Sequence, residues 1–577
     1  MPVFWFEFRA AGRRRRGHLL RAGYASYLML MVAGWWWTAE QLTVQGISAG
    51  RAIGLSGAQF AVHLATVQIM VALLAGPASA ADALGPTRRR GLLGHALLTD
   101  FSAAEIVLGT AAARLATVVL LLLAGVPMTV LAESNGAIGL GRLATLVPAL
   151  LGMALLGVSA ATALSLRTRR PYETLFVIYG IIAAWLAKWM LIGYSPPSPW
   201  QIRSNPFFFI YAAIYHSHLM GPSDAIAFLG VSFVASLTIL AWTSARLRAV
   251  VAREGKRVAA PKPRRGRLVG RLPGPRLDGN PVLWREWRHG RRSRWGRIFW
   301  AIYALGFACG CFGGIIPIRG PLHELTATVG FAAALGLLAA AIGAASCWAE
   351  ERAAGPGGLD VLLATPLSTS TIVYGKWWAS YRVIPVVALA IAIPTVVLAV
   401  TAPTLPTTPR RFRPPSVMVP LRTIDRAAVV AVVVGRVLAD GAALVGLGVW
   451  LATRSRKTAT AVVAAVSAFV FIAIVVPISA QSPLIRTNST RSERSRVLTA
   501  ASPLLGPLET LNSMFYASSF GTTRALLAYQ AGWLLASATA AAAIRWRTIR
   551  TFDRTMGRMP DGPVPVSVGA RRRGPGR

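Results

Sequence analysis

The chain has 577 residues, of which 54% are hydrophobic and only 14% are charged. In a soluble protein, a formal charge of +40 would suggest a nucleic-acid partner. Here the basic residues lie in short loops beside apolar runs that exceed the roughly 20 residues needed to cross a bilayer. This pattern argues against nucleic acid and predicts an all-α, polytopic membrane protein whose basic loops meet anionic lipid headgroups.

Twelve apolar runs predict twelve transmembrane helices. The even count, with the N-terminus placed in the cytoplasm, puts the basic segments 13–16, 88–90 and 454–457 inside, as the positive-inside rule expects. The outer loop 401–426 carries five arginines and departs from that rule. The predicted runs are 22–38, 58–79, 106–132, 143–165, 174–194, 224–245, 298–318, 327–349, 372–400, 427–451, 460–480 and 525–544.

An internal repeat divides the chain into two similar halves. Residues 1–9 align with 280–288 without a gap, and residues 97–109 align with 363–375. Each half then has six runs, so both halves enter the membrane with the same orientation, as parallel repeats do. The predicted domains are a first six-helix unit at 1–246, a basic cytoplasmic linker at 247–279, a second six-helix unit at 280–550 and a basic cytoplasmic tail at 551–577.

Each half begins with a segment that mixes aromatic and charged residues, which predicts an amphipathic helix in the headgroup region. A structural anchor and a force-transmitting element both fit this pattern. The residues that define the two interfacial helices are Trp5, Glu7 and Arg9 in the first half, and Trp284, Glu286, Trp287 and Arg288 in the second.

The most informative stretch is a polar, glycine-containing island at 348–376, between two long apolar runs. Four leucines recur at helical spacing and predict a short helix along the membrane surface. Pro366 should end that helix, and Ser368 can cap the next one. A stiff corner of this kind could transmit a movement of the surface helix to the spanning helix, although an ordinary solvated loop fits the spacing equally well. The four leucines are Leu359, Leu362, Leu363 and Leu367.

The sequence offers no motif for catalysis, for a cofactor or for a metal ion. No phosphate-binding Gly-x-x-x-x-Gly-Lys-Ser/Thr loop occurs, since Gly375-Lys376 is followed by Trp377. The histidines lack metal-binding spacing, and the three cysteines lie in apolar runs. We therefore expect a chain that is not an enzyme and binds no cofactor or metal itself.

Two charged residues lie near the middle of the tenth apolar run. Arg436 and Asp440 are four residues apart and can pair on one helix face. Charges inside a membrane span are costly, so we expect this intramembrane ion pair to meet protein or a hydrated path. Either a structural pair or a substrate path is compatible with the spacing.

The polar island closely resembles the type-2 permease family of ATP-binding-cassette (ABC) exporters. Residues 280–286 also look like the start of a half in large bacterial members. The resemblance implies a fused two-unit permease in the bacterial inner membrane that moves an unidentified substrate. ATP would be bound by separate ATPase subunits, and a second permease chain could complete the pore. The matching residues are Glu350, Glu351, Gly358, Leu359, Asp360, Leu362, Leu363, Thr365, Pro366, Leu367, Ser368, Ile372, Gly375 and Lys376.

In that family, a coupling helix between the second and third spans docks on the ATPase. The resemblance therefore implies that Glu350, Glu351 and the 357–367 helix contact such a subunit. Further coupling residues would be Leu359, Asp360, Leu363, Pro366, Ser368 and Lys376 in the second half, and Thr99, Ser102 and Glu105 in the first.

The first-half copy of the island departs from the family pattern. Leu84 and Gly85 stand where the acidic pair is expected, and Thr110 replaces the lysine. Ser102 and Glu105 still form a capping box, which keeps the helix start. These departures imply unequal coupling, stronger in the second half.

Two other function classes fit the layout. An ion-coupled secondary transporter can also have parallel six-span halves, but it would need several mid-membrane carboxylates, of which Asp440 is the only clear one. A non-transporting membrane scaffold would show no transport at all.

Overall fold

The computed structural model describes residues 2–558 with internal gaps. Most of the predicted linker, the tail beyond 558 and most of the outer loop 401–426 lie outside the described residues. The gaps are at 14, 90–91, 135–144, 169–170, 192–202, 206–220, 256–278, 290–293, 316–322, 354–357, 402–422, 456, 478–496 and 517–519.

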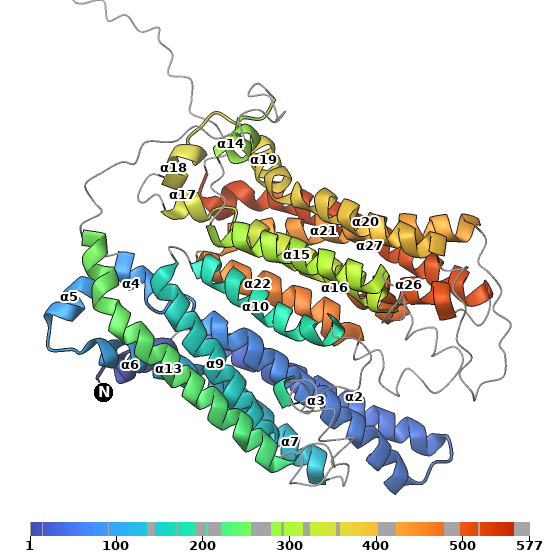
Figure 1. The fold of residues 1–577 in the computed structure, drawn as a ribbon, viewed down its shortest axis with the longest axis horizontal. Helices are drawn as coiled ribbons and strands as arrows, with labels where there is room; N and C mark the ends of the chain where they lie inside the picture. Colours follow the sequence, from blue (N-terminus) through green and yellow to red (C-terminus); the bar gives the residue numbers. More distant parts are fainter. Residues whose placement is uncertain are drawn as a thin grey trace, which may run out of the picture.

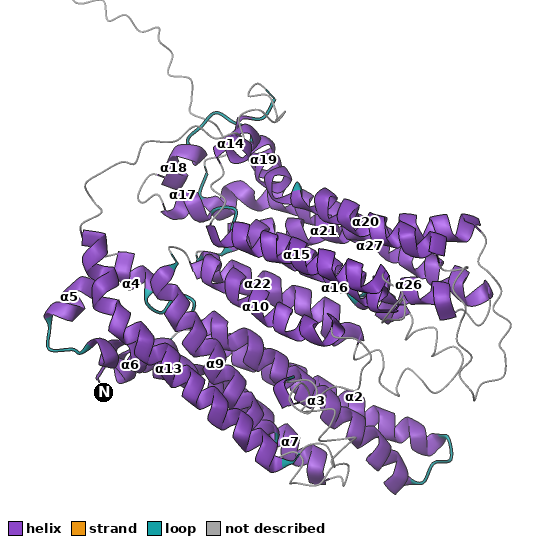
Figure 2. Cartoon of the chain, in the orientation of Figure 1, coloured by secondary structure: helices purple, strands orange, loops and turns teal. Residues whose placement is uncertain are grey.

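Every described element is a helix (Figure 2). The first half contains α1 (Pro2–Gly12), α2 (Arg15–Val44), α3 (Ala49–Ala80), α4 (Gly85–Arg89), α5 (Leu92–Leu98), α6 (Ala103–Leu122), η1 (Leu123–Gly125), α7 (Val126–Ser134), α9 (Leu146–Arg167), α10 (Pro171–Leu191) and α13 (Pro222–Gly255). The second half contains α14 (Pro281–His289), α15 (Arg294–Ile315), α16 (His323–Ala345), α17 (Ala349–Ala353), α18 (Gly358–Leu363), α19 (Thr369–Tyr381), α20 (Val383–Thr401), α21 (Thr423–Arg454), α22 (Thr458–Val470), the π-helical turn η4 (Phe471–Val475), α26 (Leu505–Tyr516) and α27 (Phe520–Met556).

Within the described part of the chain, nine helical segments are long and apolar enough to cross a membrane. The predicted runs 22–38, 174–194 and 298–318 overlap α2, α10 and α15, which fall short of that criterion. Polar residues lower the apolarity of α2, whereas α10 and α15 contain shorter apolar segments, Pro171–Ile182 and Gly296–Cys311. The chain therefore fits a multi-pass membrane protein, and twelve crossings stay a prediction.

The two halves form two helical bundles that run side by side, with α10 and α22 between them (Figure 1). Helix α10 packs on α15 and α16 of the second half, and α22 reaches α3 of the first. Two aromatic pairs join the halves. Phe176 of α10 meets Phe299 of α15 at 4.4 Å between ring centres, and Tyr27 of α2 meets Phe471 of η4 at 6.3 Å. The fifth long helix of each half thus contacts the other half.

The short helices α4, α5, α17 and α18 lie at one end of the molecule, which we call the short-helix end (Figure 1). A buried apolar cluster at this end draws on both halves. It joins Tyr179 of α10 to Trp348, Leu362 and Phe552 of the second half. Burial of such large apolar side chains stabilises the fold by roughly 1.5–3 kcal/mol each. The position of α18 is therefore fixed by packing.

The two aligned sequence blocks meet each other in space, and they do so in both halves. Helix α1 packs on α6, and α14 packs on α19. A Cβ atom added at Gly109 would lie 3.1 Å from the Cβ of Val3, and one added at Gly375 would lie 2.8 Å from the Cβ of Val282. The aligned glycines therefore give room for the aligned valines.

We expect Gly375→Ala to destabilise the protein by about 1–3 kcal/mol, because overpacking forces the valine contact apart. Thermal unfolding in detergent would measure the loss. Gly343→Ala is the matched control, since nothing lies within 4 Å of its added Cβ and alanine favours a helix. Equal stability of the two variants would contradict the close contact.

Candidate functional site

The second-half island forms a compact corner between α18 and α19. Helix α18 ends at Leu363, just before Pro366, as the sequence predicts. The hydroxyl of Ser368 accepts a hydrogen bond from the backbone N–H of Thr371 at 3.2 Å, so Ser368 caps α19. We call residues 364–368 the corner. It joins a short helix to a long one without a flexible loop.

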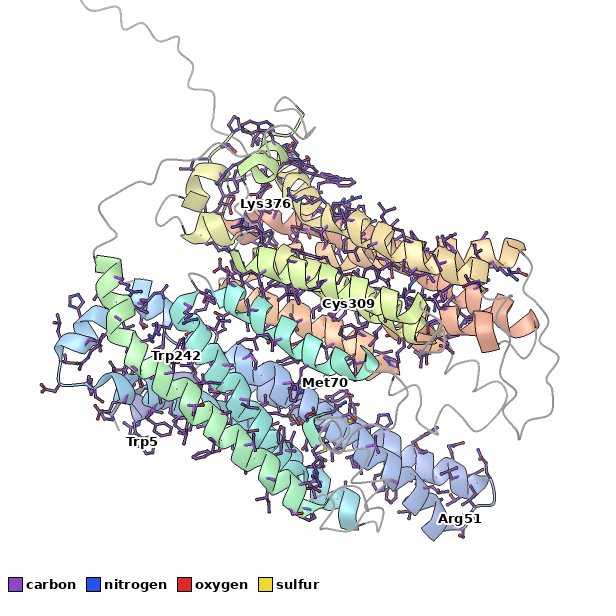
Figure 3. The ribbon with its side chains drawn as sticks, in the orientation of Figure 1. Trp5, Arg51, Met70, Trp242, Cys309 and Lys376 are labelled. Carbon is purple, nitrogen blue, oxygen red and sulfur yellow. The ribbon has the colours of Figure 1, made fainter. Side chains whose placement is uncertain are left out.

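Lys376 lies beneath the corner, at the short-helix end (Figure 3). Its Nζ donates hydrogen bonds to Oε1 of Glu286 at 2.6 Å, to Oε1 of Glu351 at 2.5 Å and to the carbonyl oxygen of Cys347 at 2.9 Å. The indole ring of Trp348 lies 5.0 Å from the same nitrogen. We call Lys376, Glu286 and Glu351 the second-half triad.

The second-half triad joins three elements, because its members come from α14, α17 and α19. The side chains of Lys376 and Glu351 are only 2% and 1% exposed. Charges buried this deeply persist only when they are paired and hydrogen-bonded. The triad therefore fixes the interfacial helix, the short-helix region and the first turns of α19 relative to one another.

The burial of the triad bears on the sequence-based expectation for two of its residues. The side chains of Glu351 and Lys376 are enclosed within this chain, so in this arrangement they form no part of its surface. The side chains of Glu350 and Asp360 lie outside the described residues. The contacts of Glu351 and Lys376 hold the elements around the corner together, and a contact of the island with an ATPase subunit stays a prediction.

The four leucines of α18 and the corner face protein. Leu362 is buried, and Leu359, Leu363 and Leu367 pack against the same cluster that holds Trp348 and Phe552. This face therefore packs on the protein, and the place of the helix along the membrane surface stays a prediction. The opposite side is open to solvent, with Val361 69% exposed. Ala364, Pro366 and Ser368 are exposed beside it.

The first half has a comparable arrangement of α4, α5 and the start of α6. Ser102 and Glu105 form the predicted capping box, with bonds of 3.0 and 3.1 Å between each side chain and the other's backbone N–H. Thr99 is exposed, and its hydroxyl donates to the carbonyl of Ala96. Leu98 is 85% exposed at the end of α5.

A second ion cluster joins α1 and α6 to the turn between α3 and α4. Arg114 on α6 reaches Oε2 of Glu7 at 3.3 Å and Oδ1 of Asp82 at 3.8 Å. We call these residues the first-half triad. Glu7 aligns with Glu286, but Arg114 lies four residues after Thr110 and Asp82 three residues before Gly85. Column-by-column alignment missed the cluster, and a search within one helical turn would have found it.

The interfacial residues divide between the triads and the surface. Trp5 is 56% exposed, and the guanidinium carbon of Arg9 lies 5.8 Å from its ring centre. Trp287 is half-buried and lies 5.2 Å from the guanidinium of Arg382, while Trp284 is also half-buried. The side chain of Arg288 lies outside the described residues.

Arg436 and Asp440 pair within α21, as their spacing predicts. The Nη2–Oδ2 distance is 3.0 Å, and both side chains are buried. Ser537 of α27 donates to Oδ1 of Asp440 at 2.6 Å, and Arg436 donates to the carbonyl of Ala501 at 3.2 Å. The pair thus binds α21 to α27 and to the segment before α26.

Comparison with known proteins gives no relative, since no family model, curated protein or solved structure matches this chain. The class of the site therefore follows from its geometry. It is a rigid junction of buried charges beneath a short helix with an exposed outer face. Among the described residues, no group of three or more metal-binding side chains comes together.

We expect Lys376→Met to destabilise the protein by about 3–5 kcal/mol, because two carboxylates lose their buried partner. Thermal unfolding would measure the effect, and adding Glu351→Gln should recover part of it. Arg285→Gln is the control, because Arg285 is 53% exposed and its contact with Glu351 is long, at 3.9 Å, so its loss should cost little stability. A Lys376→Met protein as stable as wild type would contradict the bridging role of the ammonium.

Arg114→Met should cost less, about 1 kcal/mol, because Glu7 and Asp82 are 27% and 24% exposed and water can solvate them. The same unfolding measurement compares the two halves. A larger loss for Arg114→Met than for Lys376→Met would reverse the predicted order of the triads.

Proposed function

We propose that this chain is the permease subunit of an ABC export system, which moves an unidentified substrate across the bacterial inner membrane while separate subunits bind and hydrolyse ATP. The observation that carries the proposal is the pair of triads. In each half, an ion cluster joins the first helix and the third long helix to the segment that follows the second long helix, although Arg114 lies three turns into α6. A permease that transmits the movement of a bound ATPase subunit to its membrane helices needs such a rigid junction.

The packing of the long helices supports two parallel six-helix repeats. Helix α3 packs on α9 as α16 packs on α21, and α9 packs on α13 as α21 packs on α27. The two interfacial helices, α1 and α14, occupy matching places on α6 and α19. Among the described residues, nine segments meet the criterion for a membrane span, and α2, α10 and α15 supply the remaining three of the twelve proposed.

The exposed faces of the short helices are the proposed docking surfaces. Val361 on α18 and Leu98 on α5 are large apolar side chains that project from the short-helix end. Exposed apolar side chains on a rigid support are common where a partner protein binds. We assign this end to the cytoplasm, together with both termini, because the basic segments gather there.

Anionic lipids are the second proposed partner. Arg454 and Arg547 lie 4.9 and 5.8 Å from the ring centre of Trp450, where α21 and α27 leave their apolar segments. Arginine and tryptophan at this depth suit phosphate headgroups. The exposed apolar face of α20, which includes Val386 and Leu389, would meet lipid chains or a second permease chain.

The ion-coupled alternative is disfavoured by the surroundings of Asp440. A proton- or sodium-coupling carboxylate must exchange its partner during transport. Asp440 is already neutralised by Arg436 and bonded to Ser537 within the bundle. Transport that persists without ATP and collapses with the proton gradient would nevertheless favour that class over the ABC proposal.

We expect the purified chain to show no ATPase activity alone and to stimulate a partner ABC ATPase when both are reconstituted in lipid nanodiscs. Phosphate release under substrate-free and lipid-only conditions would measure this. Robust ATP hydrolysis by the chain itself would contradict the proposal, as would a failure of every ATPase encoded beside its gene to bind.

Ala364→Glu should reduce this stimulation at least tenfold without changing thermal stability, because a charge is placed on the exposed side of the corner. Ala252→Glu on α13 is the matched control, since it adds the same charge at another exposed alanine. Leu98→Glu tests the first half, and we expect a smaller loss there. Equal stimulation by the Ala364→Glu and control proteins would exclude this face as the docking surface.

A further inference from the structure

The corner leaves backbone groups that its own helices cannot satisfy. Helix α18 ends at Leu363 and α19 begins only at Thr369, so the carbonyls of Thr365 and Leu367 lie between the two helices and have no helical partners. Both carbonyls accept hydrogen bonds from Nη2 of Arg558, at 3.1 Å for Thr365. A residue from the far end of the chain thus completes the corner.

The first residue of α19 is held from the same direction. The hydroxyl of Thr369 donates to Oδ1 of Asp553 at 2.7 Å and accepts from Nη1 of Arg558 at 3.2 Å. Asp553 and Arg558 therefore bind both sides of the corner at once. Phe552, which is fully buried, adds an apolar contact to Trp348 at 5.6 Å between ring centres.

A glycine turn at the end of α27 places Arg558 beside the corner. Gly557 has a φ of +75°, and the N–H of Arg558 bonds to the carbonyl of Asp553 at 2.9 Å. This is the Schellman ending of a helix, in which a left-handed residue reverses the chain. Nothing lies within 4 Å of a Cβ added at Gly557. Glycine is therefore needed at this position for its positive φ, since a larger side chain would meet no neighbouring atom.

We propose that the last turn of α27 is the positioning element of the corner, with Arg558 and Asp553 as positioning residues and Gly557 as the turn that directs them. This inference rests on the proposed function, because the contacts of Asp553 and Arg558 connect the end of α27 to the segment beside the proposed coupling helix. A displacement of α18 then reaches α27 directly, in addition to passing along the chain into α19.

The first half has a related apolar contact. Helix α13, its sixth long helix, touches α5, and a Cβ atom added at Gly94 would lie 3.8 Å from a methyl carbon of Val251. Leu93 and Leu247 share one apolar cluster there. The residues that follow α13 lie outside the described residues, so polar contacts like those of Arg558 are described for the second half alone.

Hydrogen exchange of the full-length chain in nanodiscs tests the inference. In Arg558→Ala, amides of the segment 364–371 should exchange at least tenfold faster, because opening of the corner becomes easier. Arg554→Ala is the matched control, since it removes an exposed arginine from the same last turn. If amides 364–371 exchange as slowly in Arg558→Ala as in the wild-type protein, the inference is overturned.

A second pair of variants separates positioning from general damage. Gly557→Val should speed exchange like Arg558→Ala, because a β-branched residue resists positive φ, whereas Gly557→Asn should stay close to wild type. Unchanged exchange in α16 and α21 shows that the fold is intact. Equal exchange in the two Gly557 variants would overturn the role of the turn.

This measurement does not require an ATPase partner. If exchange rises but no ATPase is ever stimulated, the proposed function fails and the positioning role stands. If stimulation is normal in wild type and exchange does not rise in the variants, the positioning role fails alone. In a coupled complex, Arg558→Ala should also lower stimulation at least threefold, while Arg554→Ala should not.

Discussion

The second-half part of the short-helix end depends on one buried ammonium group. Lys376 is enclosed between Glu286, Glu351 and the carbonyl of Cys347, and three helices meet at its Nζ. A charge so deeply buried cannot exist without these partners, so the elements that supply them cannot separate cheaply. Because α14, α17 and α19 are joined in this way, the corner behaves as a rigid part rather than as a loop.

Both halves join their first helix to their third long helix by an ion cluster, but they use different residues. Glu7 and Glu286 keep matching positions, whereas the cation and the second acid of the first half are displaced by about one turn. Side chains as long as those of arginine and lysine tolerate such a displacement, since their heads can reach a common point from successive turns. The first-half triad is more exposed, so it holds α1, α6 and the turn before α4 together less firmly. Unequal coupling is thus expected from burial as well as from the missing motif residues.

The surface that a partner could contact is what remains after these internal contacts are made. The leucines of α18, together with Glu351 and Lys376, are used inside the chain, and α27 holds the corner from its other side. Val361, Ala364 and Pro366 are left facing outward. A docking helix gains affinity when its inner face is fixed, because little conformational entropy is lost on binding.

The sequence by itself determined the features that depend on near neighbours. The helical runs, the end of α18 before Pro366, the caps at Ser102 and Ser368 and the Arg436–Asp440 pair all follow from residues within a few positions of each other. Only the tertiary structure decided which charges are buried together, that the leucine face meets protein, and that Arg558 completes a corner 193 residues away. Such contacts join distant segments whose approach is set by the packing of the long helices, and no local pattern records it.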